Sequence, residues 1–319
     1  MPNKLSTPNW QDHLTLTRDL VTPGERSAFF TRARKREFIA VFRGVYVRAD
    51  LWNAMGPDER YRARVKAAAA LAGRDLVFAY QSAAAQWRLP WVGEWPRQAH
   101  ILEAAATGGR SKAMLQRHTV GIPADLVEID GLTVTSLART VVDLARSASF
   151  GPAVALADAA LHRTAHPLAG VPRTFLTRDD LLRELDGVPF RRGVAKGRRV
   201  IDFADGAADR PGESMSRVNM HLMGLPRPQL QVPIVGDSGR IWIVDFWWPE
   251  FNLIGEFDGH RKYTDPEFLH GRTPEQAVID EKDREDDLRA AHHGMSRWDW
   301  EIALSPLLLR EKLIRAGLR

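Results

Sequence analysis

The chain contains no cysteine among its 319 residues, which excludes disulfides and thiolate-bound metal and favours a reducing compartment. No apolar run approaches the length of a membrane span. The first ten residues are polar and lack the apolar core of a signal peptide. We therefore expect a soluble, cytoplasmic protein with no membrane partner.

Basic residues are unevenly distributed along the chain. Residues 1–150 contain 21 Lys and Arg against 14 Asp and Glu; the totals are 45 and 40, which leaves 24 and 26 for the remainder. The basic excess therefore lies in the N-terminal half. This distribution fits a phosphate-contacting module joined to a carboxylate-bearing one, although a modest excess is also common on plain solvated surfaces. The length favours at least two domains.

Residues 10–50 read as a small helical unit followed by a hairpin. Leu14, Leu16 and Leu20 begin an apolar helical pattern, and a second helix is expected to start after Thr22. A basic cluster ends this second helix: Arg32, Arg34, Lys35 and Arg36. Alternating residues then predict two strands folded at Gly44. Helix, basic helix and β-wing is the order of a winged helix-turn-helix that binds DNA. The alternative is a solvated basic face on a small packing unit.

The middle of the chain alternates helical and strand-like segments. Apolar and capping patterns predict helices at 57–72, from Ser82 and from Ser136, and two more within 151–186. Strands are predicted at 76–79, 99–102, 114–118 and 131–135. The basic run at 191–199, followed by a Gly- and Asp-rich stretch, indicates the connection to a C-terminal domain.

Three carboxylates stand in or beside the two most apolar strands of the C-terminal part. Residues 241–248 and 253–258 are predicted strands joined by a turn at Pro249. Asp245 lies inside the first, and Glu256 and Asp258 fall at the end of the second. Carboxylates are rarely buried unless they are paired or bound to metal. The constellation therefore predicts a divalent-cation site; the alternative is that acidic residues simply mark strand ends at solvent.

Further elements surround these strands. A helix is predicted from Glu213, whose carboxylate would otherwise serve only to complement the helix dipole. A strand at 229–235, a strongly charged helix around residues 281–289, a strand at 295–300 and a closing helix at 306–316 complete the pattern. The charged helix is also typical of a plain solvated helix.

The order of Glu213, Asp245, Glu256 and Lys262 resembles the PD-(D/E)XK nuclease fold, and specifically the very-short-patch-repair-like endonuclease domains. The similarity spans about residues 205–305 and includes Gly224-Leu-Pro-Arg-Pro, Val244-Asp-Phe-Trp-Trp-Pro, Gly255-Glu-Phe-Asp-Gly and Arg297-Trp-Asp-Trp. The N-terminal half resembles the AbiEi-type antitoxins of type IV toxin–antitoxin systems. That similarity rests on Gly44-Val-Tyr-Val, Ser82-Ala-Ala-Ala and Thr135-Ser-Leu-Ala-Arg-Thr-Val-Val-Asp-Leu-Ala.

The nuclease resemblance implies a Mg²⁺ ion, with Mn²⁺ as an alternative, held by Asp245 and Glu256 and assisted by Glu213. Lys262 would orient the water or neutralise the phosphate. Arg284 and Arg217 would contact phosphate. The fold's signature has lysine two residues after the strand glutamate, whereas this chain has Asp258 there. That departure weakens the expectation of activity and makes Asp258 a candidate third ligand.

Taken together, the sequence predicts an α/β protein in three parts. Residues 1–55 form a winged-helix module, 56–190 an antitoxin-like α/β region, and 191–319 a nuclease-like domain with a mixed central sheet flanked by helices. The expected function is a Mg²⁺-dependent DNA endonuclease. The alternative is a non-catalytic DNA-binding regulator or antitoxin with a degenerate nuclease domain. DNA is the expected partner, and a cognate toxin is a second one that the resemblance allows.

Overall fold

The computed structural model describes residues 13–73, 75–104, 114–189, 191–259 and 273–319. The chain divides into two compact units. Unit 1 comprises Met1–Ser147 and Pro167–Arg198, and unit 2 comprises Ala148–His166 and Arg199–Arg319. The segment 148–166, placed by the sequence in the middle region, thus packs with the C-terminal unit. No helix among the described residues is long and apolar enough to span a bilayer.

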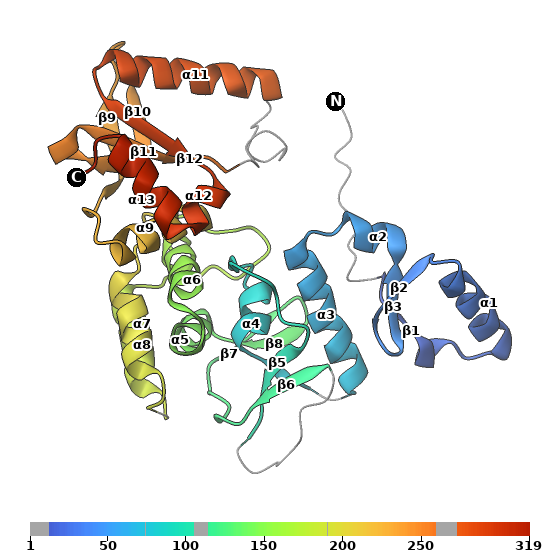
Figure 1. The fold of residues 1–319 in the computed structure, drawn as a ribbon. Helices are drawn as coiled ribbons and strands as arrows, with labels where there is room; N and C mark the ends of the chain where they lie inside the picture. Colours follow the sequence, from blue (N-terminus) through green and yellow to red (C-terminus); the bar gives the residue numbers. More distant parts are fainter. Residues whose placement is uncertain (1–12, 74, 105–113, 190, 260–272) are drawn as a thin grey trace. The chain divides into compact units, whose positions relative to one another are not determined.

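The first part of unit 1 is a three-stranded sheet with order β1-β3-β2 and two helices (Figure 1). In chain order its elements are β1 (Thr15–Leu16), the 3-10 helix Thr17–Asp19, α1 (Pro23–Arg34), β2 (Phe38–Phe42), β3 (Val45–Arg48) and α2 (Ala49–Ala54). Thr22 and Glu25 form a capping box that starts α1. Gly44, with φ +93°, makes the turn between β2 and β3, a conformation that glycine adopts without strain.

The segment around Leu14–Leu20 differs from its prediction. It forms β1 and the 3-10 helix, not an α-helix, and Leu16 pairs with Val45 across the sheet. Sheet pairing therefore overrides the local helical pattern. Within the described part of the chain, α1 is the one α-helix that precedes the hairpin. The basic helix and the two strands of the hairpin are present as predicted.

The second part of unit 1 is a five-stranded sheet with order β6-β5-β4-β8-β7. Its strands are β4 (Val77–Phe78), β5 (Ala99–Leu102), β6 (Leu115–His118), β7 (Leu126–Ile129) and β8 (Leu132–Thr135). The helices of this part are α3 (Pro57–Ala72), α4 (Tyr80–Gln86), α5 (Leu137–Ser147) and α7 (Arg178–Gly187). The sequence did not predict β7. It pairs with β8 through a two-residue turn at Asp130 and Gly131, both at positive φ, as type I′ hairpins require.

Unit 2 is built on a four-stranded sheet with order β12-β11-β10-β9. Its strands are β9 (Gln229–Val235), β10 (Ile241–Trp248), β11 (Leu253–Phe257) and β12 (Gly294–Trp298). Within this sheet, as far as the structure describes it, β11 and β12 are parallel and the other two pairs are antiparallel, so the sheet is mixed, as predicted. The helices that lie wholly in this unit are α6 (Phe150–His162), α9 (Pro211–Leu222), α11 (Pro274–Ala290), α12 (Trp300–Leu304) and α13 (Pro306–Arg315), while α8 (Val194–Phe203) runs across the boundary between the units.

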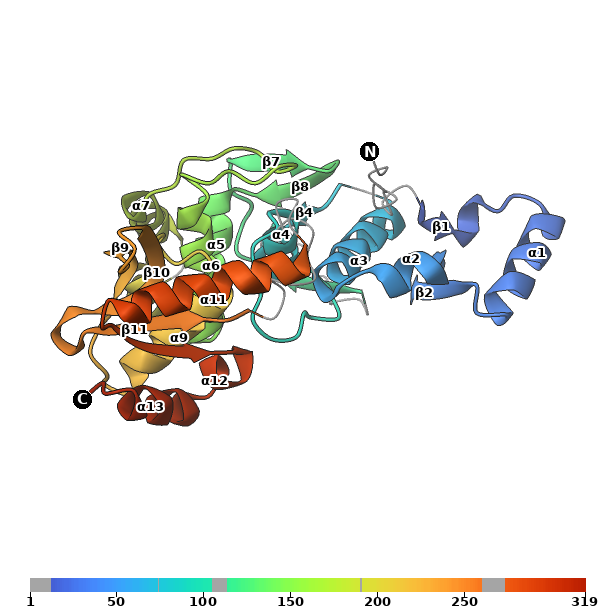
Figure 2. The ribbon, with the colours of Figure 1, turned by 90° about the horizontal axis from the view of Figure 1, so that it is seen from above.

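Two apolar layers hold the helices of unit 2 onto the sheet. One face carries Phe246, Trp248 and Phe257, which pack with side chains of α9, α12 and α13. The opposite face carries Val244 and Ile254, which pack with Leu288 of α11. Figures 1 and 2 show α11 lying along its own side of the sheet. The described part of the chain is thus a mixed α/β structure with three sheets, and the predicted strands of unit 2 are confirmed.

Candidate functional site

Asp245 and Glu256 lie at the same level of two neighbouring strands of unit 2. β10 and β11 are antiparallel, with Phe246 opposite Gly255, so one further step along each strand brings Asp245 level with Glu256. Both residues are buried, at 8% and 2% exposure. The Asp245 carboxylate accepts a hydrogen bond of 2.8 Å from the backbone amide of Phe257. The local fold therefore orients Asp245 through the main chain of the adjacent strand.

The sheet is irregular at the level of Asp245. In a regular strand, residues i and i+2 project to the same face. Here Val244 packs on the α11 face, whereas Phe246 packs on the opposite face. On the neighbouring strand, Gln231 has φ +49°, and it does not take part in the ladder pairs that flank it. Such irregularities change the direction of side chains along a strand. Asp245 lies at this irregularity, between Val244 on one face of the sheet and Phe246 on the other.

Glu213 brings a third carboxylate from the first turn of α9. It is 1% exposed, and its Oε2 accepts hydrogen bonds from the amide of Asp209 at 3.3 Å and from Gln231 Nε2 at 3.2 Å. Burial raises the pKa of Glu213 well above its usual value; Asp245 and Asp209 raise it further, and Arg210 opposes them. The effect of the Asp245 charge on the pKa of Glu213 indicates that the two carboxylates lie close together. Glu213 thus lies near Asp245, which is level with Glu256 on the neighbouring strand, so these three predicted site residues lie together.

Guanidinium groups compensate part of this negative charge. Arg284, from α11, donates to both oxygens of Glu256, at 2.7 and 3.2 Å. Arg210 lies 3.9 Å from Glu213 Oε1; burial alone would lower its pKa, but the surrounding carboxylates, Asp209, Glu213, Asp245 and Glu256, raise it. Arg284, for which the resemblance implies a phosphate contact, thus pairs with a carboxylate of the site, and it also donates to the carbonyl of Ile243 and to Glu281.

Asp258 follows β11 directly, at the position where the resembled signature has lysine. Its backbone amide donates to the carbonyl of Trp298 at 2.7 Å, which fixes the residue against β12. Its carboxylate contributes to the raised pKa of Arg297, a residue that also pairs with Glu281. Lys262, predicted to act beside the carboxylates, lies outside the described residues.

The carboxylate oxygens of this cluster are suitable ligands for a hard cation, although the described side chains do not already form a metal-binding site. Over the ranges that the structure describes, no group of three or more His, Asp or Glu side chains is arranged to hold a metal ion. Glu213 Oε1 and Asp258 Oδ1 are buried and, among the described residues, accept no hydrogen bond. Buried carboxylate oxygens in this state are costly unless a proton or cation satisfies them. Mg²⁺ and Mn²⁺ prefer such oxygen ligands.

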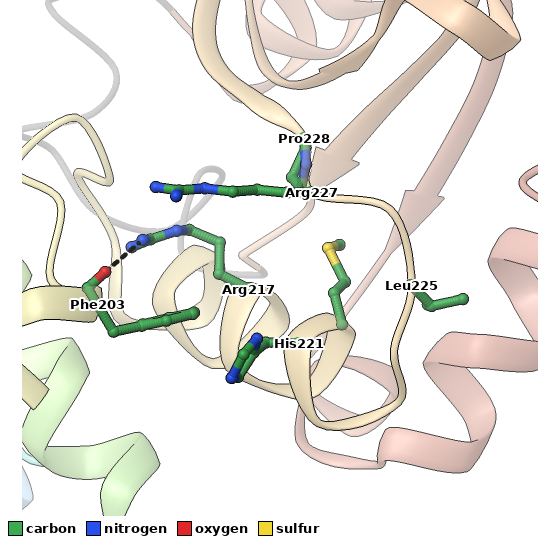
Figure 3. A pocket seen from close by; sticks show the side chains of 7 residues that line it. Phe203, Arg217, His221, Leu225, Arg227 and Pro228 are labelled. Atoms are coloured by element: carbon green, nitrogen blue, oxygen red, sulfur yellow. Dashed lines mark hydrogen bonds between the residues drawn. The ribbon is translucent and has the colours of Figure 1, made fainter. Parts of the chain in front are cut away.

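Arg217 pairs with Asp158, away from the carboxylates of the candidate site. Its guanidinium is 5% exposed, donates to Asp158 Oδ2 at 2.7 Å and to the carbonyl of Phe203 at 2.9 Å, and lies over the Phe203 ring. It lines a cavity of about 160 Å³, shown in Figure 3, with His221 and Arg227 beside it. Because both ends of the guanidinium are engaged inside unit 2, the prediction that Arg217 contacts phosphate is not supported by its contacts.

The predicted basic cluster lies at the end of α1 and in the turn that follows. Arg32, Arg34, Lys35 and Arg36 are all exposed. Arg32 forms an ion pair of 2.7 Å with Glu37. The structure thus keeps the cluster at the surface, where the sequence placed it.

Sequence reasoning did not identify Arg210, Asp209 or Gln231 as members of the carboxylate site. Arg210 and Asp209 precede α9, and Gln231 occupies the irregular position of β9. The spacing of Arg210 three residues before Glu213 at a helix start was an available signal. The sequence contains no comparable signal for Gln231, because its position in the site depends on the irregular pairing of β9.

The chain is similar to two mycobacterial proteins. Both are named as uncharacterized proteins: Rv2248 of Mycobacterium tuberculosis strain H37Rv, and MT2308 of strain CDC 1551. Each is 32% identical over 175 residues, which is 54% of this chain and 60% of the relative. The chain therefore spans about three fifths of the length of these relatives. No protein-family model matches the chain.

Proposed function

We propose that unit 2 is a Mg²⁺-dependent endonuclease of the PD-(D/E)XK type that hydrolyses phosphodiester bonds in DNA. We further propose that the first part of unit 1 is a winged-helix module, related to the AbiEi-type antitoxins, that binds the DNA. The observation that carries the proposal is the burial of Glu213 beside Asp245 and Glu256. Three carboxylates gathered at low solvent exposure repel one another, and a divalent cation would relieve that repulsion.

The residues would divide the work according to their positions. Asp245 and Glu256 would hold the cation, with Glu213 and Asp258 offering the oxygens that lack hydrogen-bond partners. When bound, the cation would supply an activated water and stabilise the charge that develops at the scissile phosphate. Arg284, released from Glu256, would then be free to clamp a phosphate oxygen. Lys262 keeps the role that the resemblance gives it.

A second function has specific support. Arg284 occupies both oxygens of Glu256, and Asp258 replaces the lysine of the nuclease signature. A charge-paired glutamate and a missing lysine are features of a site kept for its fold. On this reading the protein is a non-catalytic DNA-binding regulator or antitoxin of a type IV system. A cognate toxin remains a prediction under either function.

Cleavage assays separate the two functions. Supercoiled and linear DNA are incubated with Mg²⁺, Mn²⁺ or EDTA, using wild type, Asp245→Asn and Glu256→Gln. We expect metal-dependent cutting that falls by about 100-fold or more in both variants, because losing one ligand charge removes several kcal/mol of stabilisation. Glu311→Gln is the control, since that carboxylate belongs to an exposed ion pair with Arg315 on α13. DNA binding without cutting under either metal would favour the regulator.

A further inference from the structure

A group of arginines on unit 1 has no part in the site described above. Arg60 and Arg64 lie one turn apart on α3, so they share a face of that helix. Their guanidinium carbons lie 5.6 and 5.8 Å from the ring centroid of Trp52, which belongs to α2. Arg60 also donates to the carbonyl of Trp52 at 3.1 Å. Together with Arg97 we call these residues the α3 arginine cluster: Arg60, Arg64 and Arg97.

The positive charges of the α3 arginine cluster are near one another. Burial lowers the pKa of Arg64; Tyr61 opposes this, and the charges of Arg60 and Arg97 lower it further. No carboxylate is among the groups that act on Arg64. Across the described ranges, none of the three arginines has a carboxylate oxygen within 4 Å. Like charges held together without a counter-ion indicate a surface that is complementary to an anion.

The acidic residues near α3 are directed elsewhere. Glu59 accepts from the amide of Gly56 and lies 3.9 Å from Arg62, on a different side of the helix. Asp58 accepts from Trp95 Nε1 at 2.8 Å and acts on the pKa of Arg62, not on that of Arg64. The cluster therefore retains its positive charge although α3 begins with two acidic residues.

Aromatic side chains adjoin the cluster. Trp95, two residues before Arg97, stacks on Tyr61 with 4.6 Å between ring centroids and 14° between ring planes. Trp91 continues the stack, 5.8 Å from Trp95. Both tryptophans are partly exposed. Arginines interleaved with aromatic rings are typical of surfaces that follow a nucleic-acid backbone and stack against its bases.

We infer that the α3 arginine cluster is a phosphate-contacting surface for DNA, separate from the basic end of α1. The inference takes its partner from the proposed function and adds the face of unit 1 that binds it. DNA is favoured over an acidic protein because aromatic side chains adjoin the arginines, a combination typical of nucleic-acid-binding surfaces. The arginine clusters of α1 and α3 would then both contact the DNA strand that reaches unit 1.

The salt dependence of DNA binding measures the number of phosphate contacts. Each contact adds about 0.9 to the slope of log K against log salt for duplex DNA, and about 0.7 for a single strand. Replacing all three arginines by glutamine should therefore reduce the slope by about 2.7 or about 2.1. Between 50 and 200 mM salt, the loss of affinity should be about 40-fold smaller for duplex and about 20-fold smaller for a single strand.

The experiment compares wild type with Arg60→Gln/Arg64→Gln/Arg97→Gln, by fluorescence anisotropy on labelled duplex and single-stranded DNA. EDTA is present throughout, so the result is independent of cleavage. The matched control is Arg173→Gln/Arg183→Gln/Arg191→Gln, which removes the same charge from exposed arginines elsewhere in unit 1. Arg97 is exposed, so Arg97→Gln alone should leave the packing intact. It should lower the slope by about 0.9 on duplex DNA, or about 0.7 on a single strand, which corresponds to one phosphate contact.

The outcomes are distinguishable. A reduced slope on either form of DNA, with the control unchanged, supports the inference. A triple variant that matches wild type in affinity and slope on both forms overturns it, whether or not unit 2 cuts DNA. If wild type binds neither form of DNA in EDTA or in Mg²⁺, and does not cut either form, the DNA partner of the proposed function falls, and the inference falls with it. If binding is normal and cleavage is absent, only the enzymatic proposal is overturned.

Discussion

Replacing Glu213 by glutamine should make the metal-free protein more stable in mildly alkaline solution than wild type. Burial, Asp245 and Asp209 raise the pKa of Glu213 well above 4.5, so its ionised form is disfavoured in the folded protein. Glutamine resembles the protonated acid. It can still accept from the amide of Asp209 and from Gln231, as Oε2 of Glu213 does at 3.3 and 3.2 Å. The variant therefore removes a buried charge while keeping those contacts.

The sign and size of this effect follow from proton binding. A carboxyl with a higher pKa in the folded state binds more protons there than in the unfolded state between the two pKa values, so the free energy of unfolding falls as pH rises through that range. Each unit of pKa elevation corresponds to about 1.4 kcal/mol. The variant and wild type should agree at and below about pH 4.5. Their difference should then grow by up to about 1.4 kcal/mol per pH unit until the raised pKa is passed.

Urea unfolding in EDTA, at a series of pH values from about 5 to about 8.5, tests this prediction through tryptophan fluorescence, to which the core residues Trp248 and Trp298 contribute. Burial also raises the pKa of Asp158, to about 6, so the pH profile of wild type alone does not isolate Glu213. The difference in stability between wild type and the variant isolates the contribution of Glu213. Mg²⁺ should stabilise wild type more than the variant. A variant that is less stable than wild type at pH 8, or a difference that is constant with pH, would contradict a raised pKa at Glu213.

Two further predictions concern packing in unit 2. Arg217→Met should lower the free energy of unfolding by about 3–5 kcal/mol in urea titrations, because it leaves Asp158 charged and buried without its partner at 2.7 Å; a loss below about 1 kcal/mol would show that the pair is dispensable. Gly212→Ala should cost about 1–3 kcal/mol, because its new Cβ would lie 2.0 Å from the Phe257 ring, whereas Gly187→Ala, with nothing within 4 Å, should be nearly neutral in the same thermal-melting experiment.

The pairing of Glu256 with Arg284 bears on both proposed functions. A bidentate guanidinium–carboxylate contact at low exposure is strong and geometrically specific. A metal ion that uses Glu256 must compete with Arg284, which makes cation affinity dependent on where that guanidinium can move. Phosphate oxygens of bound DNA provide one such destination. Cation binding and DNA binding are therefore expected to support each other in an active nuclease.

Regular local patterns explain which elements could be predicted. The residues of β9 and β10 are rich in β-branched and aromatic types, and both strands were predicted with the bounds observed. The helix α13 starts at Pro306 after the cap Ser305, which is a local signal as well. By contrast, Leu16 followed a helical spacing and yet forms a strand with Val45, a partner far along the chain.

The amino-acid sequence was enough to single out the carboxylates Glu213, Asp245 and Glu256, to place them on a helix and two strands, and to locate the basic cluster. Those features depend on residue type and on periods of a few residues. The three-dimensional arrangement was needed to show that Arg284 pairs with Glu256 and that Arg217 pairs with Asp158, 59 positions away. The raised pKa of Glu213 also follows from that arrangement. Ion pairing and desolvation depend on which distant side chains share a buried volume, and local patterning does not encode that distance.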